Sequence, residues 1–249
     1  MKETAYFFAK SAVGLRHPDN QDRVWTRELA DGGVLLALAD GMGGAAAGGL
    51  AAEVAIQFLE NALNGEALQA SILVEALKAA GQEIVSLSHA DESLAGMGTT
   101  LTVVAVGYGK ACWAHVGDSR LQHLSAGGLT QISRDHRFLQ DLLDCGEVTP
   151  EELPHHPLRN VLDQCLGCPV MHPDSGSFAV APGDLLLLTS DGVHDHVPPE
   201  RMIRLLSSPS SLEEMADALI AEARQAGSTD DLSAVLYRII EWTGPPEAT

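Results

Sequence analysis

Runs of apolar and β-branched residues recur along the chain and predict β-strands. Five such runs cover residues 34–39, 101–106, 111–116, 185–189 and 233–240. Only four residues separate the second run from the third, and two of them, Gly107 and Gly109, are glycines. A connection of that length and composition is typical of a hairpin, so we expect these two strands to be antiparallel neighbours.

Helical composition fills three other stretches, at residues 49–63, 67–90 and 211–225. The first two follow one another with no strand between them. Strands are therefore grouped with strands and helices with helices, which argues against repeated βαβ units and favours sheets and helices in separate layers. The fold class expected from this grouping is α+β.

Two segments depart from the pattern. Residues 137–170 contain short helical pieces interrupted by several prolines, together with a His155-His156 pair. We interpret this segment as a small inserted subdomain or lid. Residues 244–249 are expected to be a frayed C-terminal tail.

Composition and charge narrow the possible partners. The 249 residues are 45% hydrophobic, which suits one generous domain or two small ones and excludes a wholly disordered chain. With 15 Lys and Arg against 34 Asp and Glu, the net charge is −19. Nucleic acid and anionic membrane surfaces are therefore poor candidate partners.

Segment lengths and cysteines bear on location. No apolar run approaches the ~18 residues that suggest a membrane span, and the N-terminus does not resemble a signal peptide. Four cysteines are too few for a disulfide scaffold, so the reducing cytoplasm is the expected location. A monomer is expected. Cys165 and Cys168 form a single C-x-x-C pair that could be redox-active or half of a zinc site, but no second pair completes a zinc site, and we interpret the pair as coincidental.

The chemically informative feature is an aspartate at the end of a predicted strand. Asp40 and Asp191 each follow an apolar run, Asp118 follows another, and Asp230 precedes the last strand. Clustered carboxylates repel one another unless protons or cations intervene, and carboxylate oxygens suit Mg²⁺ or Mn²⁺. Any single Asp-Gly pair is equally well an ordinary turn. The recurrence favours a metal site.

A dinucleotide-binding interpretation competes with this one. Residues 41–46 match a G-x-G-x-x-A fingerprint after a strand. That fold requires one helix and then a second strand with a terminal acid, whereas two helices are predicted here. A nicotinamide-dependent enzyme is therefore the weakest of the functions considered.

Eight short motifs in order resemble the metal-dependent PP2C-type (PPM) protein serine/threonine phosphatases, and most closely their short bacterial single-domain members. The resemblance covers residues 1–243, leaving the tail outside. The motifs are Arg16 with Asn20-Gln21-Asp22, Ala39-Asp40-Gly41-Met42-Gly43-Gly44, Gly96-Met97-Gly98-Thr99-Thr100, Val116-Gly117-Asp118-Ser119-Arg120, Ser133-Arg134-Asp135-His136, His156-Pro157-Leu158-Arg159-Asn160, Ser190-Asp191-Gly192 and Gly227-Ser228-Thr229-Asp230.

The resemblance implies a four-layer α-β-β-α sandwich of two antiparallel sheets flanked by helices, with a dinuclear Mn²⁺ or Mg²⁺ centre at one end. Asp40 would bridge the two ions and the Gly41 carbonyl would bind the second. Asp191 and Asp230 would complete the first, and Asp118 with Asp191 would hold a possible third ion. Residues 137–170 would be a flap beside the cleft.

The activity implied is hydrolysis of phosphoserine and phosphothreonine in proteins, the substrates of a serine/threonine kinase. Paired cations lower the pKa of a bridging water, and a guanidinium can position the phosphoryl oxygens. Arg16 is the candidate for that guanidinium, and Asp22 joins Arg16 and Asp40 as a catalytic residue. Arg120 and Arg159 are either substrate contacts or members of structural ion pairs.

Departures from the family pattern leave a second function open. Arg16 lies six residues before Asp22 instead of the usual five, and Gln21 replaces the usual glutamate. Asp231 stands where asparagine is common. These changes are compatible with a catalytically weak module that binds or senses a phosphorylated partner. Retention of all four aspartates in metal positions favours the enzyme.

Overall fold

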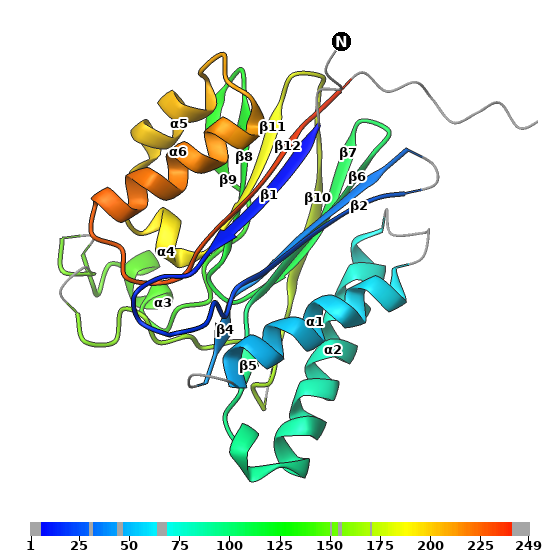
Figure 1. Ribbon diagram of the computed structural model, residues 1–249, viewed down its shortest axis with the longest axis vertical. Coiled ribbons are helices and arrows are strands. Elements are labelled where there is room, and N and C mark those ends of the chain that lie inside the picture. Colours follow the sequence, from blue (N-terminus) through cyan, green and yellow to red (C-terminus); the bar gives the residue numbers. More distant parts are fainter. Residues whose placement is uncertain are drawn as a thin grey trace, which may run out of the picture.

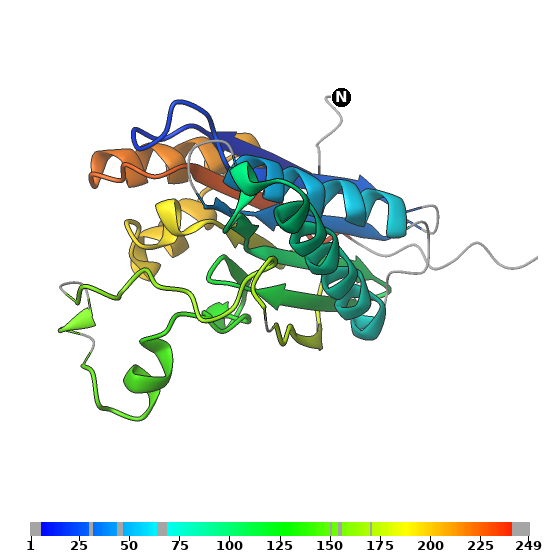
Figure 2. The same ribbon diagram turned by 90° about the horizontal axis from the view of Figure 1, so that it is seen from below.

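Two five-stranded antiparallel sheets face one another at the centre of the molecule, and helices cover both outer faces (Figures 1 and 2). The computed structural model describes residues 6–29, 32–43, 47–63, 69–149, 151–153, 156–169 and 171–240. The expected α+β class and four-layer arrangement are confirmed. His155 and the predicted tail lie outside the described residues.

The first sheet has the strand order β1-β12-β11-β8-β9. Its outer face packs against three helices near the C-terminus, which meet it through a cluster of buried apolar side chains. These elements are β1 (Phe7–Ala12), β8 (Arg120–Ser125), β9 (Gly128–Gln131), β11 (Leu185–Thr189), β12 (Leu232–Arg238), α4 (Asp191–His194), α5 (Pro199–Leu206) and α6 (Leu212–Gln225).

The second sheet has the order β10-β7-β6-β3-β2, and two long helices cover its outer face (Figure 1). A two-stranded sheet of β4 and β5 lies beside it. The elements of this half are β2 (Arg23–Glu28), β3 (Val34–Ala39), β4 (Gly41–Met42), β5 (Gly98–Thr99), β6 (Leu101–Gly107), β7 (Lys110–Val116), β10 (Asp174–Ala179), α1 (Ala47–Ala62), α2 (Ala70–Ala90) and the 3₁₀ turn η1 (Glu92–Leu94). The short helix α3 (Gln140–Asp144) belongs to the 137–170 segment.

The central strands are buried on both faces. In β3, for example, Leu36 and Leu38 face the opposite sheet while Leu35 and Ala37 pack towards α1 and α2. A strand covered on both sides reads as a continuous apolar run instead of an alternating one. This is why the runs in β3, β6, β7, β11 and β12 were recognisable in the sequence, and all five are confirmed.

Local signals also agree with the observed elements. Tyr108 and Gly109 connect β6 and β7 with φ values of 51° and 73°, as a two-residue type I′ hairpin turn requires. Helix α6 begins with a capping box, in which the Ser211 hydroxyl accepts from the Glu214 N–H at 3.2 Å and the Glu214 carboxylate accepts from the Ser211 N–H at 2.8 Å. The hairpin and the three predicted helices are therefore confirmed.

Three observations bear on the other expectations. In the part of the chain that the structure describes, every strand pair is antiparallel. A dinucleotide-binding fold is built from parallel βαβ units, so this arrangement excludes it. Cys165 and Cys168 form a disulfide, so the interpretation of this pair as coincidental is wrong. Within the described ranges, no helix has both the length and the apolar character needed to cross a membrane.

Strand register gathers the candidate residues at one end of the sandwich. Ala39 at the end of β3 pairs with Arg23 at the start of β2, and Leu101 at the start of β6 pairs with Val116 at the end of β7. In the other sheet, Thr189 at the end of β11 pairs with Ala234, near the start of β12. All five aspartates of the site lie within two residues of these strand ends, and therefore at the same pole: Asp22, Asp40, Asp118, Asp191 and Asp230.

Candidate active site

Asp40 lies at the centre of a group of carboxylates. The electrostatic influences on it come, in decreasing order, from Asp22, Asp191, Asp118 and Asp230. The structure therefore brings together every aspartate that the sequence placed in a site, from five different segments of the chain.

The position of Asp40 is fixed through its backbone. Its N–H donates to the Thr100 hydroxyl at 3.0 Å, and its carbonyl accepts from the Thr99 hydroxyl at 2.9 Å and the Thr100 N–H at 2.8 Å. The Thr100 hydroxyl is in turn 2.7 Å from the hydroxyl of Ser119. Two of the sequence motifs thus form a scaffold that holds Asp40 at the end of β3.

Gly41 occupies a position where no side chain fits. A Cβ built there would lie 2.2 Å from the carbonyl oxygen of Gly48 and 2.8 Å from that of Gln21. The start of α1 and the loop before β2 can therefore approach the residue after Asp40 as closely as they do. This close approach explains the glycine physically, whatever the role of its carbonyl.

Arg16 reaches the pole because its loop is folded back onto the turn before β12. The N–H groups of Leu15 and Arg16 both donate to the Thr229 carbonyl, at 2.7 and 3.0 Å. The Arg16 guanidinium forms an ion pair with Asp230. The loop that is one residue longer than the family pattern still places a guanidinium beside the carboxylates.

Asp231 is a positioning residue that the sequence did not reveal. Its buried carboxylate accepts from the Gly14 N–H and from the Gln21 N–H, each at 2.7 Å. It therefore clamps both ends of the loop that carries Arg16. The only signal in the sequence was its place beside Asp230, where it stood as a replacement for asparagine.

Burial and mutual repulsion oppose ionisation of these carboxyl groups. Burial raises the pKa of Asp22 to about 7, in spite of the opposing effect of the Ser233 and Ser190 hydroxyls beside it. Burial, followed by the neighbouring aspartates, raises the pKa values of Asp40 and Asp191 well above the usual range. At neutral pH the group needs either protons or cations to be stable.

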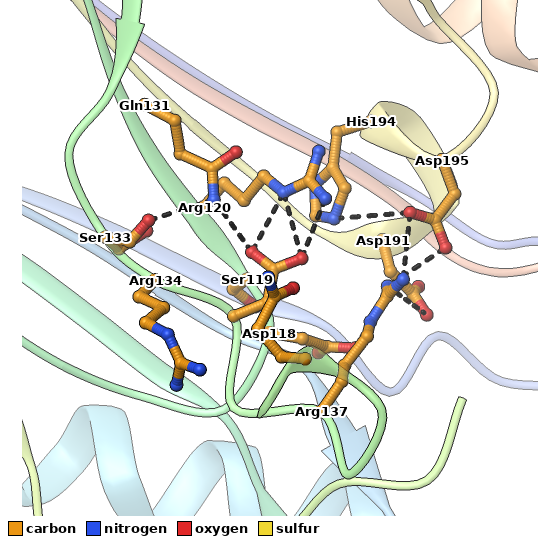
Figure 3. Close-up of polar contacts among 12 residues, drawn as sticks. Asp118, Ser119, Arg120, Gln131, Ser133, Arg134, Arg137, Asp191, His194 and Asp195 are labelled. Carbon is orange, nitrogen blue, oxygen red and sulfur yellow. Dashed lines mark hydrogen bonds and ion pairs between the residues drawn. The ribbon is translucent and has the colours of Figure 1, made fainter. Parts of the chain in front are cut away.

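Arg137 is a second residue that sequence reasoning missed. Its side chain is only 9% exposed and pairs with Asp118 and Asp195, as Figure 3 shows. Burial alone lowers the pKa of this guanidinium, but Asp118 and Asp195 raise it by more, so the group stays charged. Burial raises the pKa of Asp118 less than that of Asp40 because Arg137 opposes the rise.

Two adjoining cavities open at the pole. One of about 220 Å³ is lined by Arg16, Gln21, Asp40, Asp118 and Asp230 among others. The second, of about 330 Å³, shares Arg16, Asn160 and Asp230 with the first and adds Arg137 and Arg159. The carboxylates therefore line a cleft with guanidinium groups at its border, which is a suitable place for a phosphorylated ligand.

The donor set fits a hard divalent cation. The groups at the pole are carboxylate, carbonyl and hydroxyl oxygens, which Mg²⁺ and Mn²⁺ prefer. Within the described ranges, no three His, Cys, Asp or Glu side chains are close enough to enclose an ion by themselves. Ions held by a few carboxylates and completed by water fit this pole better than ions in an all-protein cage.

Comparison with known proteins decides the family. The protein phosphatase 2C family model matches residues 16–237. This chain belongs to the protein phosphatase 2C family. As a member of it, the chain is a serine/threonine protein phosphatase, and its substrates are phosphoproteins.

Relatives and solved structures resemble this phosphatase over almost its whole length. Protein phosphatase PhpP of Streptococcus pneumoniae is 33% identical over 235 residues, 92% of this chain and 95% of PhpP. The serine/threonine phosphatase of S. agalactiae superposes with a TM-score of 0.87 at 28% identity, covering 95% of this chain and 100% of the other. A PstP catalytic domain in complex with two manganese ions gives 0.83 at 34% identity, covering 94% and 98%.

Other motif residues of this phosphatase serve the scaffold. Asp135 receives a bidentate contact from Arg120, with Nε–Oδ1 at 3.0 Å and Nη2–Oδ2 at 2.7 Å. His136 Nδ1 accepts from the Gly117 N–H at 3.1 Å, next to Asp118. Of the two arginines left open by the sequence, Arg120 belongs to a structural ion pair, whereas Arg159 lines the larger cavity.

Proposed function

We propose that this phosphatase hydrolyses phosphoserine and phosphothreonine in proteins at a dinuclear Mn²⁺ or Mg²⁺ centre around Asp40. The observation that carries the proposal is the convergence of Asp22, Asp118, Asp191 and Asp230 on Asp40. Burial disfavours the charged form of four of these five groups, Asp22, Asp40, Asp118 and Asp191. Cations relieve that repulsion, and the group is retained at a cost in stability that a purely structural role would not explain.

In this proposal each side chain at the pole has a role set by its place. Asp40, Asp191, Asp230 and the Gly41 carbonyl would hold the two ions. When bound, the ions supply a water of lowered pKa and neutralise charge on the phosphoryl group. Arg16 leaves Asp230 to donate to the phosphoryl oxygens. Asp22, whose carboxylate exerts the strongest charge effect on Asp40, adds to the negative field that favours cations there.

We expect the affinity of the centre for its second ion to depend on Gln21. This side chain is buried, and its amide oxygen lies where a Cβ on Gly48 would meet it at 2.7 Å. A neutral amide in this place contributes one charge less than glutamate would to the second ion. We expect the two ions to bind with unequal affinity, and Gln21→Glu to bring the affinities closer together.

Partner and segment assignments follow from the same proposal. The substrates are products of a serine/threonine kinase, the enzyme works as a cytoplasmic monomer, and residues 137–170 act as a flap beside the cleft. The net charge of −19 steers basic phosphopeptides into the cleft faster than acidic ones. Equal rates for the two peptide classes at low salt would contradict this steering.

The sequence also left open a catalytically weak module that binds or senses a phosphorylated partner. Membership of the protein phosphatase 2C family and the named phosphatases among the relatives favour the enzyme. The ion pair between Arg16 and Asp230 bears on the rate of the enzyme, because Arg16 has to leave Asp230 before it contacts a phosphoryl group.

The test is hydrolysis of a chromogenic aryl phosphate with Mn²⁺, with EDTA, and by the Asp40→Asn variant. We expect EDTA to abolish turnover and Asp40→Asn to lower kcat/KM by roughly 10³-fold, the equivalent of about 4 kcal/mol of transition-state stabilisation. Asp217→Asn is the matched control, because Asp217 is an exposed acid on α6 that pairs with Lys10. Turnover that survives EDTA, or an Asp40→Asn variant as active as the control, would refute the dinuclear mechanism.

A further inference from the structure

Three carboxylates at the pole share a cation that belongs to the chain itself. Arg137 Nε donates to Asp118 Oδ2 at 2.8 Å, and its two terminal nitrogens contact the Asp195 carboxylate at 3.2 and 2.9 Å. The same guanidinium is 3.9 Å from Asp191 Oδ2. Figure 3 shows Arg137 directed between Asp191 and Asp195, with Asp118 beside it.

The place of Arg137 in the fold explains how it reaches these acids. It directly follows His136, which is hydrogen-bonded to the backbone before Asp118, and it forms an isolated β-bridge with Leu162. The residue therefore lies where the 137–170 segment leaves the sandwich. Its backbone is held from two sides and its side chain projects into the pole.

A guanidinium in this position competes with a metal ion for the same oxygens. It is permanently charged, and its planar fork matches the Asp195 carboxylate. An ion on Asp118 Oδ2 would displace Nε from that oxygen. An ion between Asp118 and Asp191 on the remaining oxygens would still lie beside the positive charge that contacts both residues. Asp40 has no such competitor at comparable strength, because the four largest electrostatic influences on it are all carboxylates.

We propose that Arg137 is a built-in counter-ion that takes the place of a third metal ion, so that this phosphatase binds two divalent cations and reserves Asp118 for the guanidinium. The proposal rests on the dinuclear centre proposed above. It replaces the expectation that Asp118 and Asp191 hold a third ion. A small neutral residue at position 137 would open a third site.

The test is the Mn²⁺ stoichiometry, measured as the loss of the free-ion electron paramagnetic resonance signal during titration. We expect two ions per chain in the wild type, three in Arg137→Ser, and two in Arg137→Lys, which keeps the charge. Adding Asp118→Asn to Arg137→Ser should return the count to two. Arg134→Ser is the matched control, because Arg134 is a neighbouring arginine that pairs with Asp141 and Asp144, away from the cleft.

Each result decides between the alternatives. A folded Arg137→Ser variant that still binds two ions would overturn the built-in counter-ion and leave the dinuclear centre intact. A wild type that binds none would overturn both proposals. If Arg137→Ser does not fold without metal, the wild type alone remains decisive: a count of three that falls to two in Asp118→Asn would show that Asp118 holds an ion.

Discussion

The two halves of the acidic pole solve the same electrostatic problem differently. Around Asp40 and Asp22, burial above all and then neighbouring carboxylates raise the pKa values, and the nearby charges that act most strongly on Asp40 are all acids. Around Asp118 and Asp195, Arg137 supplies a positive charge from within the chain. The half around Asp40 and Asp22 needs cations from solution. The half around Asp118 and Asp195 does not, because the ion pairs with Arg137 neutralise its charge within the chain.

The largest expected effect concerns the half without an internal cation. Because the folded-state pKa of Asp22 is raised from 3.8 to about 7, the metal-free protein loses stability as pH rises through that window. Asp22→Asn removes this loss. At about 1.36 kcal/mol per pKa unit, the variant should be more stable than wild type by up to about 4 kcal/mol in EDTA at pH 8, and equal to it near pH 4.

Urea unfolding of both proteins across this pH range measures the difference. Mn²⁺ should narrow this difference at pH 8, because cations held around Asp40 stabilise the charged Asp22 carboxylate of the wild type and find no charge on the amide of the variant. A wild type that is as stable as Asp22→Asn at pH 8 without metal would contradict the strain assigned to this half.

In the half that contains Arg137, we expect replacing an aspartate by asparagine to lower the free energy of unfolding instead of raising it. Asp118→Asn removes the charged acceptor of a hydrogen bond from a buried guanidinium, and should cost about 2 kcal/mol in EDTA at pH 8. The same urea experiment gives this value. An Asp118→Asn variant that is more stable than the wild type would mean that Asp118 is strained like Asp22, and would contradict the difference between the two halves.

A smaller effect is expected for the clamp on the Arg16 loop. Asp231→Asn replaces one accepting oxygen with an NH₂ group. One of the two hydrogen bonds from backbone N–H groups is then lost and the other is no longer charge-assisted, so the variant should cost about 1.5 kcal/mol. Since Arg16 then loses its fixed place, KM for a phosphopeptide should rise more than kcat falls. A change in stability with an unaltered KM would show that the clamp does not position Arg16.

The smallest change in stability is expected for Arg16 itself. Its side chain is 53% exposed and its ion pair with Asp230 is open to solvent, so Arg16→Ala should alter the free energy of unfolding by less than about 1 kcal/mol. KM should nevertheless rise about tenfold, as expected for losing about 1.4 kcal/mol of binding. Unchanged kinetics in this variant would favour Arg159, on the wall of the larger cavity, as the phosphate contact.

How much the sequence revealed depended on burial. Strands such as β3 and β11 are covered on both faces and were recognisable as apolar runs, whereas the edge strands β2 and β10 carry polar residues on their open faces and were missed. The aspartates of the pole were found because each lies within two residues of a strand end. Arg137 was missed because its partner Asp195 lies 58 residues away, and only the folded chain brings them together.

Diffraction from crystals grown with Mn²⁺, recorded at the manganese absorption edge, tests the difference between the halves most directly. We expect two anomalous peaks beside Asp40, with the guanidinium of Arg137 still between Asp118 and Asp195. A map with no manganese beside Asp40, or with an ion between Asp118 and Asp191 in place of Arg137, would contradict this expectation.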